Sequence, residues 1–316
     1  MKPTVSKKWQ EWQSRVLARA DSLTAPYLRV GAPIPLLNIA RQQRVKQFVF
    51  KRLPIDGGIS VADDGFVIFI NCAESDVDTY NRGLASEDDG GITLPVKVRF
   101  TIAHEIAHTF LYDLRTMRSP VSGHHPKELA SLERTCNQGA ARLLVPESLL
   151  SRALMTAPSL DARGLTRIAA GFRVSTQCLV HRLQRSTAWA ETGRVALVTI
   201  EKAGVQRICA SAMDGPARLL FPRIDYDADL SLFARADSLI LFGGPENSVE
   251  IHVPSRIAAQ VASQRCIITC EQLSSEPRTF FVVIARLGGP VIIGNLSNRR
   301  DASDRCSRRC SAMAEA

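Results

Sequence analysis

Two histidines and a glutamate lie within five residues of one another in His104-Glu105-Ile106-Ala107-His108. Residues four apart share one face of a helix, so both imidazoles can reach one metal ion while Glu105 points toward a water on that metal. This is the zinc-peptidase arrangement, in which the metal acidifies a water and the carboxylate takes its proton. The alternative is a surface helix with two solvated histidines, which a third ligand of the right kind would disfavour.

The sequence around the two histidines predicts the helix that must hold them. Thr101 is the expected N-cap, because a threonine hydroxyl can accept a hydrogen bond from a free amide of the first turn. Ile102, Ile106, Phe110 and Leu114 then form one apolar face.

A catalytic zinc needs three protein ligands and one open position. A metzincin would carry glycine at position 111 and histidine at position 114, whereas this chain has Leu111 and Leu114, so that class is excluded. The next candidate is Glu133, which we expect at the start of a second helix that stops near Pro146. The small residues at 139–141 would let this helix pack closely on the first.

Other readings of the acidic residues stay open at this point. Glu133 alone could be a solvated glutamate favoured by the helix dipole. Asp113 and Glu128 compete as ligands, but each lies five residues from the relevant histidine or glutamate. On a continuous helix such a residue is turned away by about 140°.

Two motifs in this order resemble those of the ImmA/IrrE metallopeptidases. The first is R-F-T-I-A-H-E-I-A-H, ending at His108, and the second runs E-x-x-C-N-x-x-A-x-x-L-L-x-P from Glu133 to Pro146. Cys136 stands where the family has alanine, and Gly139 stands where it has an aromatic residue. The resemblance implies a minimal zincin-like fold with His104, His108 and Glu133 as metal ligands and Glu105 as the general base.

Composition predicts an ordinary globular protein of two or three small domains. The chain has 316 residues, of which 45% are hydrophobic and 22% are charged. We expect a cytoplasmic protein, because the first residues lack the apolar segment of a signal peptide and no stretch reaches 18 apolar residues. The eight cysteines are then most simply reduced thiols. The pairs Cys266/Cys270 and Cys306/Cys310 remain candidates for a second metal or a redox site.

The segment before the metal helix is expected to supply a helix and a small sheet. The patterns predict helices over 4–21 and 35–43, and a polar loop over 76–93. Strands are expected over 45–50, 58–61 and 66–71, with a hairpin turn at Asp63-Asp64-Gly65. In zincins the strand beside the metal helix can pair with an extended substrate. Phe66 to Asn71 is our candidate for that edge strand.

Residues 164–183 look like a helix-turn-helix, with a turn at Gly171 and Ser175 as the N-cap of the second helix. Such a unit can place its second helix in a DNA major groove, which makes DNA contact through 160–190 possible. A compact helical domain or a protein-contacting one fits equally well. Five arginines make the segment basic: Arg163, Arg167, Arg173, Arg182 and Arg185.

The remaining residues read as an α+β region followed by a basic tail. Strands are expected over 194–200, 207–211, 238–242, 249–252, 266–269, 279–286 and 291–294, with a helix over 254–263. IrrE-like members of the family carry a GAF-like domain here, a resemblance by position and pattern only. Part of the net charge of +9 sits in the tail, which is typical of a solvated end but could touch nucleic acid or an acidic partner.

Together these patterns predict an α+β protein of three domains and a tail. They are a zincin-like metallopeptidase domain (1–150), a helix-turn-helix-like helical domain (151–190), a GAF-like domain (191–298) and a basic tail (299–316). The metal is expected to be Zn²⁺, although two imidazoles and a carboxylate also accept Mn²⁺ or another divalent ion. Tyr112, His124 and His125 are candidates for an additional donor to the transition state.

The resemblance implies a function for these parts. The chain would be a zinc-dependent metalloendopeptidase that cuts a helix-turn-helix transcriptional repressor at one site and so releases stress-response genes. The alternatives are a DNA-binding regulator that keeps the peptidase fold as a scaffold, and a general degradative protease.

Overall fold

The structure is a computed structural model that describes residues 7–86, 94–119, 126–190 and 192, together with the C-terminal strands named below. These residues combine helices with small sheets, so the fold is α+β, as predicted. The chain divides into two compact units. The first comprises Met1–Pro158 and Gly164–Ala188, and the second comprises Ser159–Arg163 and Trp189–Ala316.

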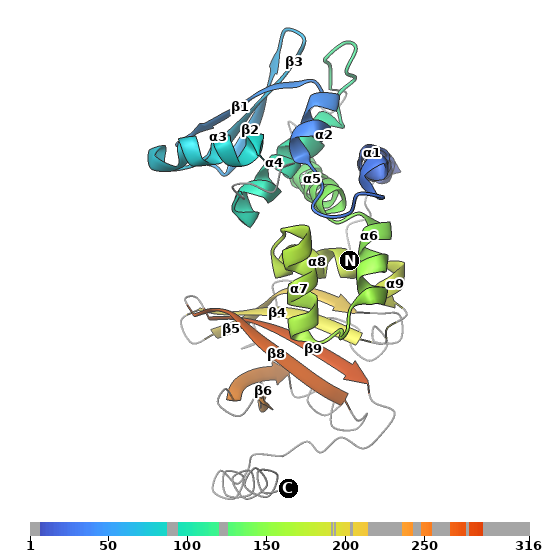
Figure 1. Ribbon diagram of the computed structural model, residues 1–316, viewed down its shortest axis with the longest axis vertical. Helices are drawn as coiled ribbons and strands as arrows, with labels where there is room; N and C mark the ends of the chain where they lie inside the picture. Colours follow the sequence, from blue (N-terminus) through green and yellow to red (C-terminus); the bar gives the residue numbers. More distant parts are fainter. Residues whose placement is uncertain are drawn as a thin grey trace, which may run out of the picture. The chain divides into compact units, whose positions relative to one another are not determined.

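The first unit contains a small sheet and several helices (Figure 1). Its strands are β1 (Val45–Lys51), β2 (Gly57–Ala62) and β3 (Gly65–Asn71). Its helices, including α7, which begins in the second unit, are α1 (Lys7–Thr24), α2 (Leu36–Gln42), α3 (Val77–Ala85), α4 (Val96–Thr109), α5 (Pro126–Leu144), α6 (Glu147–Thr156), α7 (Ala162–Phe172) and α8 (Thr176–Leu183), with short 3-10 turns at Ala25–Tyr27 and Glu74–Asp76.

The sheet has the strand order β1-β3-β2, with β3 parallel to β1 and antiparallel to β2. Phe66, Ile68 and Ile70 are buried on one face of β3, whereas Val67 and Phe69 on the other face are partly exposed. This alternation is that of a sheet covered on one side only. The predicted hairpin at residues 63–65 is confirmed, since Ala62 pairs with Gly65 across the turn.

The prediction that residues 66–71 form the edge strand was wrong, because β3 lies at the centre of the sheet. In this position β3 is hydrogen-bonded to a neighbouring strand on both sides. Of the two edge strands in the described sheet, β2 lies beside α4, and its Gly57 approaches the side chains of that helix.

Helix α4 carries both histidines and is buried over most of its circumference. It begins at Val96, after the extended Pro95. The prediction that Thr101 is its N-cap was therefore wrong. Instead the Thr101 hydroxyl donates to the Lys97 carbonyl oxygen inside the helix at 3.1 Å. Arg99 of the same helix is fully buried and donates from Nη2 to the Ile34 carbonyl oxygen at 2.9 Å.

Helix α5 packs directly on α4 and α1 (Figure 1). The close approach depends on Gly139, as the run of small residues predicted. A Cβ on Gly139 would lie 3.1 Å from the Ala107 Cβ and 2.7 Å from Val16 Cγ1. Contacts that short displace their neighbours, so a glycine at 139 sets the spacing of the three helices.

Helix α3 occupies part of the segment that we predicted as a loop. Residues 77–85 are helical, while 87–93 lie outside the described residues. Gly83 and Leu84 are buried, and the Tyr80 ring meets the Phe50 ring of β1 edge-on at 5.8 Å. We predicted a loop because the polar residues and glycines of the segment obscure this apolar face in the sequence. Packing against β1 stabilises the helix in the folded chain.

Helices α7 and α8 are joined by a short turn, as the helix-turn-helix pattern predicted. The turn itself is at Arg173, which has a φ of 53°, whereas Gly171 lies within α7. Ser175 is the N-cap of α8, and its hydroxyl accepts a hydrogen bond from the Cys178 amide at 3.1 Å, as expected.

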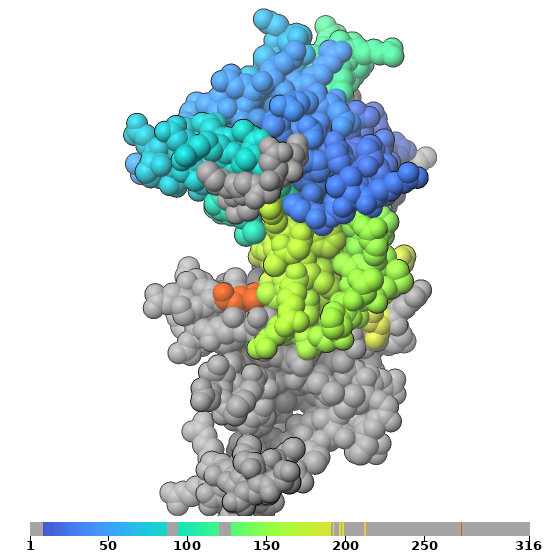
Figure 2. Space-filling view, viewed as in Figure 1, coloured from blue at the N-terminus to red at the C-terminus, as the bar shows by residue number. Residues whose placement is uncertain are grey.

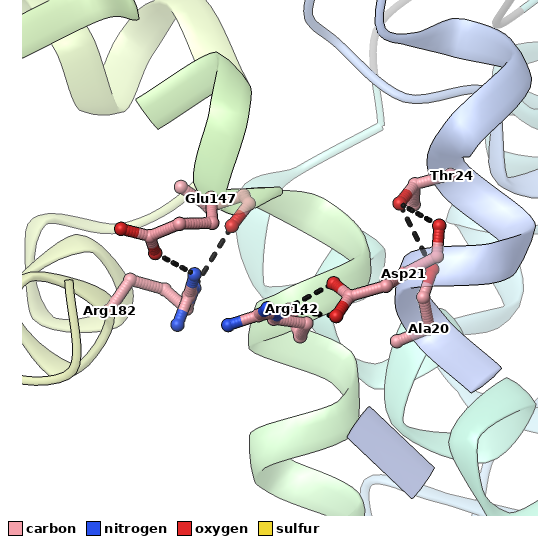
Figure 3. Close-up of polar contacts among 7 residues, drawn as sticks. Ala20, Asp21, Thr24, Arg142, Glu147 and Arg182 are labelled. Carbon is pink, nitrogen blue, oxygen red and sulfur yellow. Dashed lines mark hydrogen bonds and ion pairs between the residues drawn. The ribbon is translucent and has the colours of Figure 1, made fainter. Parts of the chain in front are cut away.

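A polar network fixes α8 to the helices that precede it (Figure 3). Arg182 is 3% exposed; its Nε donates to the Val145 carbonyl oxygen at 2.9 Å and its Nη2 to Glu147 Oε2 at 2.9 Å. Glu147 Oε1 also accepts from the Ser186 hydroxyl at 2.7 Å. One buried guanidinium therefore joins the end of α5 and the start of α6 to α8.

The burial of Arg182 changes how the basic segment is interpreted. Three of the five arginines are exposed, namely Arg163, Arg167 and Arg185. Figure 2 shows part of the surface formed by α6 and α7 in green and yellow-green. Helix α8, the helix that would read DNA, buries six of its eight side chains. Arg182 is therefore committed to contacts within the first unit and is not available to a phosphate backbone.

The second unit contains six described strands in two sheets. They are β4 (Arg194–Lys202), β5 (Val205–Met213), β6 (Ala236–Phe242), β7 (Ser248–Pro254), β8 (Cys266–Ser275) and β9 (Arg278–Arg286). One sheet has the order β5-β4-β9-β8 and is antiparallel throughout, and the other pairs β6 with β7. The short helix α9 (Thr187–Ala190) precedes β4.

Several sequence predictions for this unit meet the described strands, and others fall outside them. Every predicted strand from 194 to 286 is present within a few residues. Pro254, the first residue of the predicted helix over 254–263, instead ends β7, and the rest of that helix lies outside the described residues. The predicted strand over 291–294, the tail and the pair Cys306/Cys310 also lie outside them. Cys266 and Cys270 both lie on β8, in a stretch with regular pairing to β9. Four residues of extended chain span about 13 Å, too far for a disulfide between these two cysteines.

Among the described helices, none is long and apolar enough to cross a membrane. Cys72, Cys136 and Cys178 are buried free thiols. Burial raises the pKa of Cys178 to about 12.

Replacing Gly139 should destabilise the protein by separating α5 from α4 and α1. We expect Gly139→Leu to lower the free energy of unfolding by about 1–3 kcal/mol, because the added atoms overpack a filled contact. Urea-induced unfolding followed by circular dichroism measures this. The matched control is Gly171→Ala on α7, where a Cβ meets no atom within 4 Å. That change should be neutral or stabilising by up to ~1 kcal/mol. Equal stability of the two variants would contradict the close-packing argument.

Replacing Arg182 should unfold the junction of α5, α6 and α8. Arg182→Ala leaves the half-buried Glu147 carboxylate without its cationic partner, so we expect a loss of about 3–5 kcal/mol in the free energy of unfolding. Thermal unfolding gives the comparison with Arg167→Ala, an exposed arginine whose removal should change stability by less than about 0.5 kcal/mol. A stable Arg182→Ala variant with weakened DNA binding would restore the DNA-contacting interpretation.

Candidate active site

Helix α4 presents both histidines on one face, as the four-residue spacing predicted. The side chains of His104 and His108 are each 13% exposed. Their Nε2 atoms lie 3.0 Å apart, and the two rings meet edge-on. The pair is thus partly shielded from water but open on one side.

Helix α5 brings Glu133 to the histidines. Glu133 Oε2 lies 3.1 Å from His104 Nε2, and Glu133 Oε1 lies 3.6 Å from His108 Nε2. We expected Glu133 at the start of α5, but it lies in the middle of this helix, because α5 already begins at Pro126. The packing of α5 on α4, which includes the close approach of Gly139 to Ala107, brings this carboxylate to the histidines.

These three side chains form the metal-ligand cluster, and it could hold a metal ion. One ligand atom from each of His104, His108 and Glu133 lies within 4.8 Å of the other two. Two ligands of a tetrahedral zinc are about 3.3 Å apart, close to the 3.0, 3.1 and 3.6 Å separations observed. The donor set of two imidazoles and one carboxylate suits Zn²⁺ and also other divalent ions.

Asn137 supports the cluster from the next turn of α5. Its Oδ1 lies 2.8 Å from His104 Nδ1. Because a carbonyl oxygen only accepts, the histidine donates from Nδ1, which leaves the Nε2 lone pair of a neutral imidazole facing Glu133 and His108. In that tautomer three electron-rich atoms converge, and they attract a cation, either a metal ion or a proton that a histidine shares with Glu133. The motif contained Asn137, and its i+4 spacing from Glu133 was the available signal for this role.

The charges around the cluster shift the pKa values of its members. Burial opposes the charged imidazole of His104, but its hydrogen bonds to Glu133 and Asn137 and the nearby carboxylates outweigh burial and raise its pKa. Hydrogen bonds from both histidines hold the pKa of Glu133 well below its usual value. The pKa of Cys136, buried one turn after Glu133, is raised by burial first and then by the two carboxylates.

Glu105 lies beside the cluster in a more apolar setting. It is 5% exposed, and burial is the main reason that its pKa is raised. The strand β2 is its neighbour, because a Cβ on Gly57 would lie 2.9 Å from Glu105 Oε1. A buried carboxylate with a raised pKa can exchange a proton near neutral pH more readily than a solvated one.

The other candidate residues do not join the cluster. Tyr112 was a candidate donor, but α4 already ends at Thr109, so Tyr112 does not share the helix face of His104. Its ring instead meets Phe66 edge-on with centroids 5.1 Å apart. The exposed Asp113 accepts from the Arg115 amide at 2.8 Å. Asp113 and Glu128 are absent from the three-residue group, and His124 and His125 lie outside the described residues.

Residues 95–184 match a family model described as the IrrE N-terminal-like domain, a peptidase family. This segment of the chain is therefore similar to the IrrE N-terminal-like domain. The matched segment begins immediately before α4 and ends immediately after α8, so it contains the metal-ligand cluster and also the helices α6 to α8. For these residues the match confirms the ImmA/IrrE resemblance that the two motifs indicated.

Two further comparisons complete the picture. A solved structure described as a Mycobacterium tuberculosis transcriptional regulator has 14% sequence identity to this chain and a TM-score of 0.40, and the alignment covers 88% of this chain and 80% of that one. A TM-score this low does not establish a common fold. No curated protein matches the chain.

Replacing Asn137 should weaken metal binding without removing a ligand. We expect Asn137→Leu to lower the affinity for Zn²⁺ by about 10–100-fold, because His104 loses the acceptor that orients its ring. Asn137→Asp keeps an acceptor and should bind at least as tightly as the wild type. Competition with a chromophoric chelator measures both, with Arg134→Leu, an exposed neighbour on α5, as control. Unchanged affinity in Asn137→Leu would contradict the orienting role.

Proposed function

We propose that this protein is a site-specific, metal-dependent endopeptidase that cleaves a helix-turn-helix transcriptional repressor and thereby releases stress-response genes. The observation that carries the peptidase part is the convergence of His104, His108 and Glu133 with the buried Glu105 beside them. The repressor substrate and the stress response come from the resemblance to IrrE-like proteins.

Glu105 is the proposed general base and acid of the reaction. A divalent ion held by His104, His108 and Glu133, most simply Zn²⁺, would supply Lewis acidity to a water and to the scissile carbonyl. The Glu105 carboxylate would accept a proton from the attacking water and then donate it to the leaving amine. Its burial favours this role, because a raised pKa brings the carboxylate closer to neutral pH.

The free edge of β2 is the proposed binding surface for the substrate backbone. Among the described strands β2 pairs with β3 alone, and it lies beside α4. An extended peptide could add to this edge by main-chain hydrogen bonds, which give affinity with little dependence on side chains. A segment bound there would pass next to Glu105, which Gly57 of β2 approaches.

We also propose that α7 and α8 serve the peptidase rather than bind DNA. The family match includes these helices, and Arg182 is used in contacts to Val145 and Glu147. The assignments of a helix-turn-helix domain over 151–190 and a GAF-like domain over 191–298 remain proposals from pattern. The antiparallel sheet of β4, β5, β8 and β9 is compatible with the latter.

A co-expression cleavage assay tests the proposed function. The protein would be produced with helix-turn-helix repressors encoded beside it, and each repressor would be measured by intact mass. We expect one discrete cut by the wild type. Glu105→Gln should cut at least about 100-fold more slowly while binding metal normally, because only the proton-transfer group is lost.

Two controls separate the alternatives. His104→Ala should lose both metal and cleavage, and a chelator should abolish cleavage until metal is returned. Broad digestion of unfolded casein would instead indicate a general protease. Repressors that stay intact with metal bound, together with regulation that persists in Glu105→Gln, would favour the DNA-binding regulator.

A further inference from the structure

Gly57, the first residue of β2, touches the side chains of α4 more closely than any side chain would allow. A Cβ at this position would lie 2.7 Å from Thr101 Cγ2, 2.9 Å from Glu105 Oε1 and 3.1 Å from the Phe69 carbonyl oxygen. The backbone of Gly57 does not have the positive φ that favours glycine. Space, and not backbone conformation, therefore requires glycine here.

The next residue shows that the constraint is local to one face of the strand. Gly58 points to the opposite face, because successive strand residues alternate. A Cβ at Gly58 would meet only Ile55 Cδ1, at 3.9 Å, which is an ordinary contact. Of this glycine pair, only Gly57 lies against Glu105.

The register of the sheet shows where the backbone groups of Gly57 point. Gly57 is paired with Ile70, and the Asn71 amide donates to the Asp56 carbonyl oxygen at 2.9 Å. In an antiparallel pair, this bond makes Gly57 and Ile70 a pair without mutual hydrogen bonds. The N–H and C=O of Gly57 are consequently directed to the free edge of β2.

We propose that Gly57 is a positioning residue for the general base. Its bare Cα lets the Glu105 carboxylate rest against β2 at the point where the strand offers its own N–H and C=O to a substrate. The base and the backbone-binding groups thereby share one wall of the site, and a side chain at 57 would push the carboxylate out of line. This inference rests on the proposed peptidase function.

The kinetic test compares Gly57→Ala with Gly58→Ala, using the repressor identified by the co-expression assay. We expect Gly57→Ala to lower kcat by about 10–100-fold, because a displacement of about 1 Å can cost that much. KM should stay within about threefold of the wild-type value, since the metal ligands and the backbone groups at the free edge of β2 are unchanged. Affinity for Zn²⁺ should equal that of the wild type. Gly58→Ala should keep its rate within about threefold of wild type.

A second measurement does not depend on cleavage. In a double-mutant cycle on Tm, Gly57→Ala is introduced into the wild type and into Glu105→Ala. The alanine should lower Tm more in the wild type, because removing the Glu105 carboxylate relieves the contact. The same cycle is repeated with Thr101→Ser in place of Glu105→Ala. This change removes the Cγ2 methyl and so measures the contact between position 57 and Thr101.

Each outcome decides the matter. Wild-type kcat in Gly57→Ala, an equal loss in Gly57→Ala and Gly58→Ala, or a large fall in Zn²⁺ affinity would overturn the positioning role. If the wild type cuts no repressor, the proposed function fails, and the Tm cycle then decides whether Gly57 and Glu105 are coupled. An additive cycle would overturn the inference by itself.

Discussion

The spacing between α4 and α5 is the constraint on which the rest of the site depends. Ala107 lies between the two histidines in sequence, and Gly139 lies six residues after Glu133. The two helices can approach only because a Cβ is missing at 139. Interiors are packed too tightly to absorb one more methyl group without movement. The distances between Glu133 and the imidazoles are therefore set by apolar packing well away from the polar atoms themselves.

The site holds two carboxylates in contrasting environments. Glu133 is 45% exposed in its side chain and lies 3.1 Å and 3.6 Å from the two imidazoles, so its pKa is low and it stays charged. Glu105 is almost completely buried, and its pKa is raised. Neighbouring acids whose environments push their pKa values apart are suited to different tasks. One can hold a cation while the other carries a proton.

The residues of the candidate site could be predicted from the sequence more completely than the strands and helix boundaries around them. Helical spacing places His104 and His108 together whatever the rest of the chain does, and a second helix with small residues brings Glu133 to them. The position of β3 in the sheet could not be read in this way, because strand order depends on pairing between distant segments. Thr101 was misassigned as a cap because the helix continues for five residues before it. Helix α3 was missed because its stability comes from packing on β1 rather than from its own composition.

Arginine 182 shows the same limit for charge patterns. Five arginines in one segment suggested a surface for a polyanion, yet the sequence cannot say which of them faces inward. Arg182 lies below the surface, between a carbonyl at the end of α5 and a carboxylate at the start of α6. Those contacts are local to the first unit, and they make the charge part of the scaffold.

The Arg182 network also determines how small an autonomous peptidase could be. A fragment ending at residue 150 would contain all four residues of the proposed chemistry, but it would lose Arg182 and Ser186. Glu147 would then keep its charge without its partners, and the Val145 carbonyl would lose its donor. A fragment that keeps these contacts has to extend to at least Ser186, so α7 and α8 belong to the same folding unit as the candidate site.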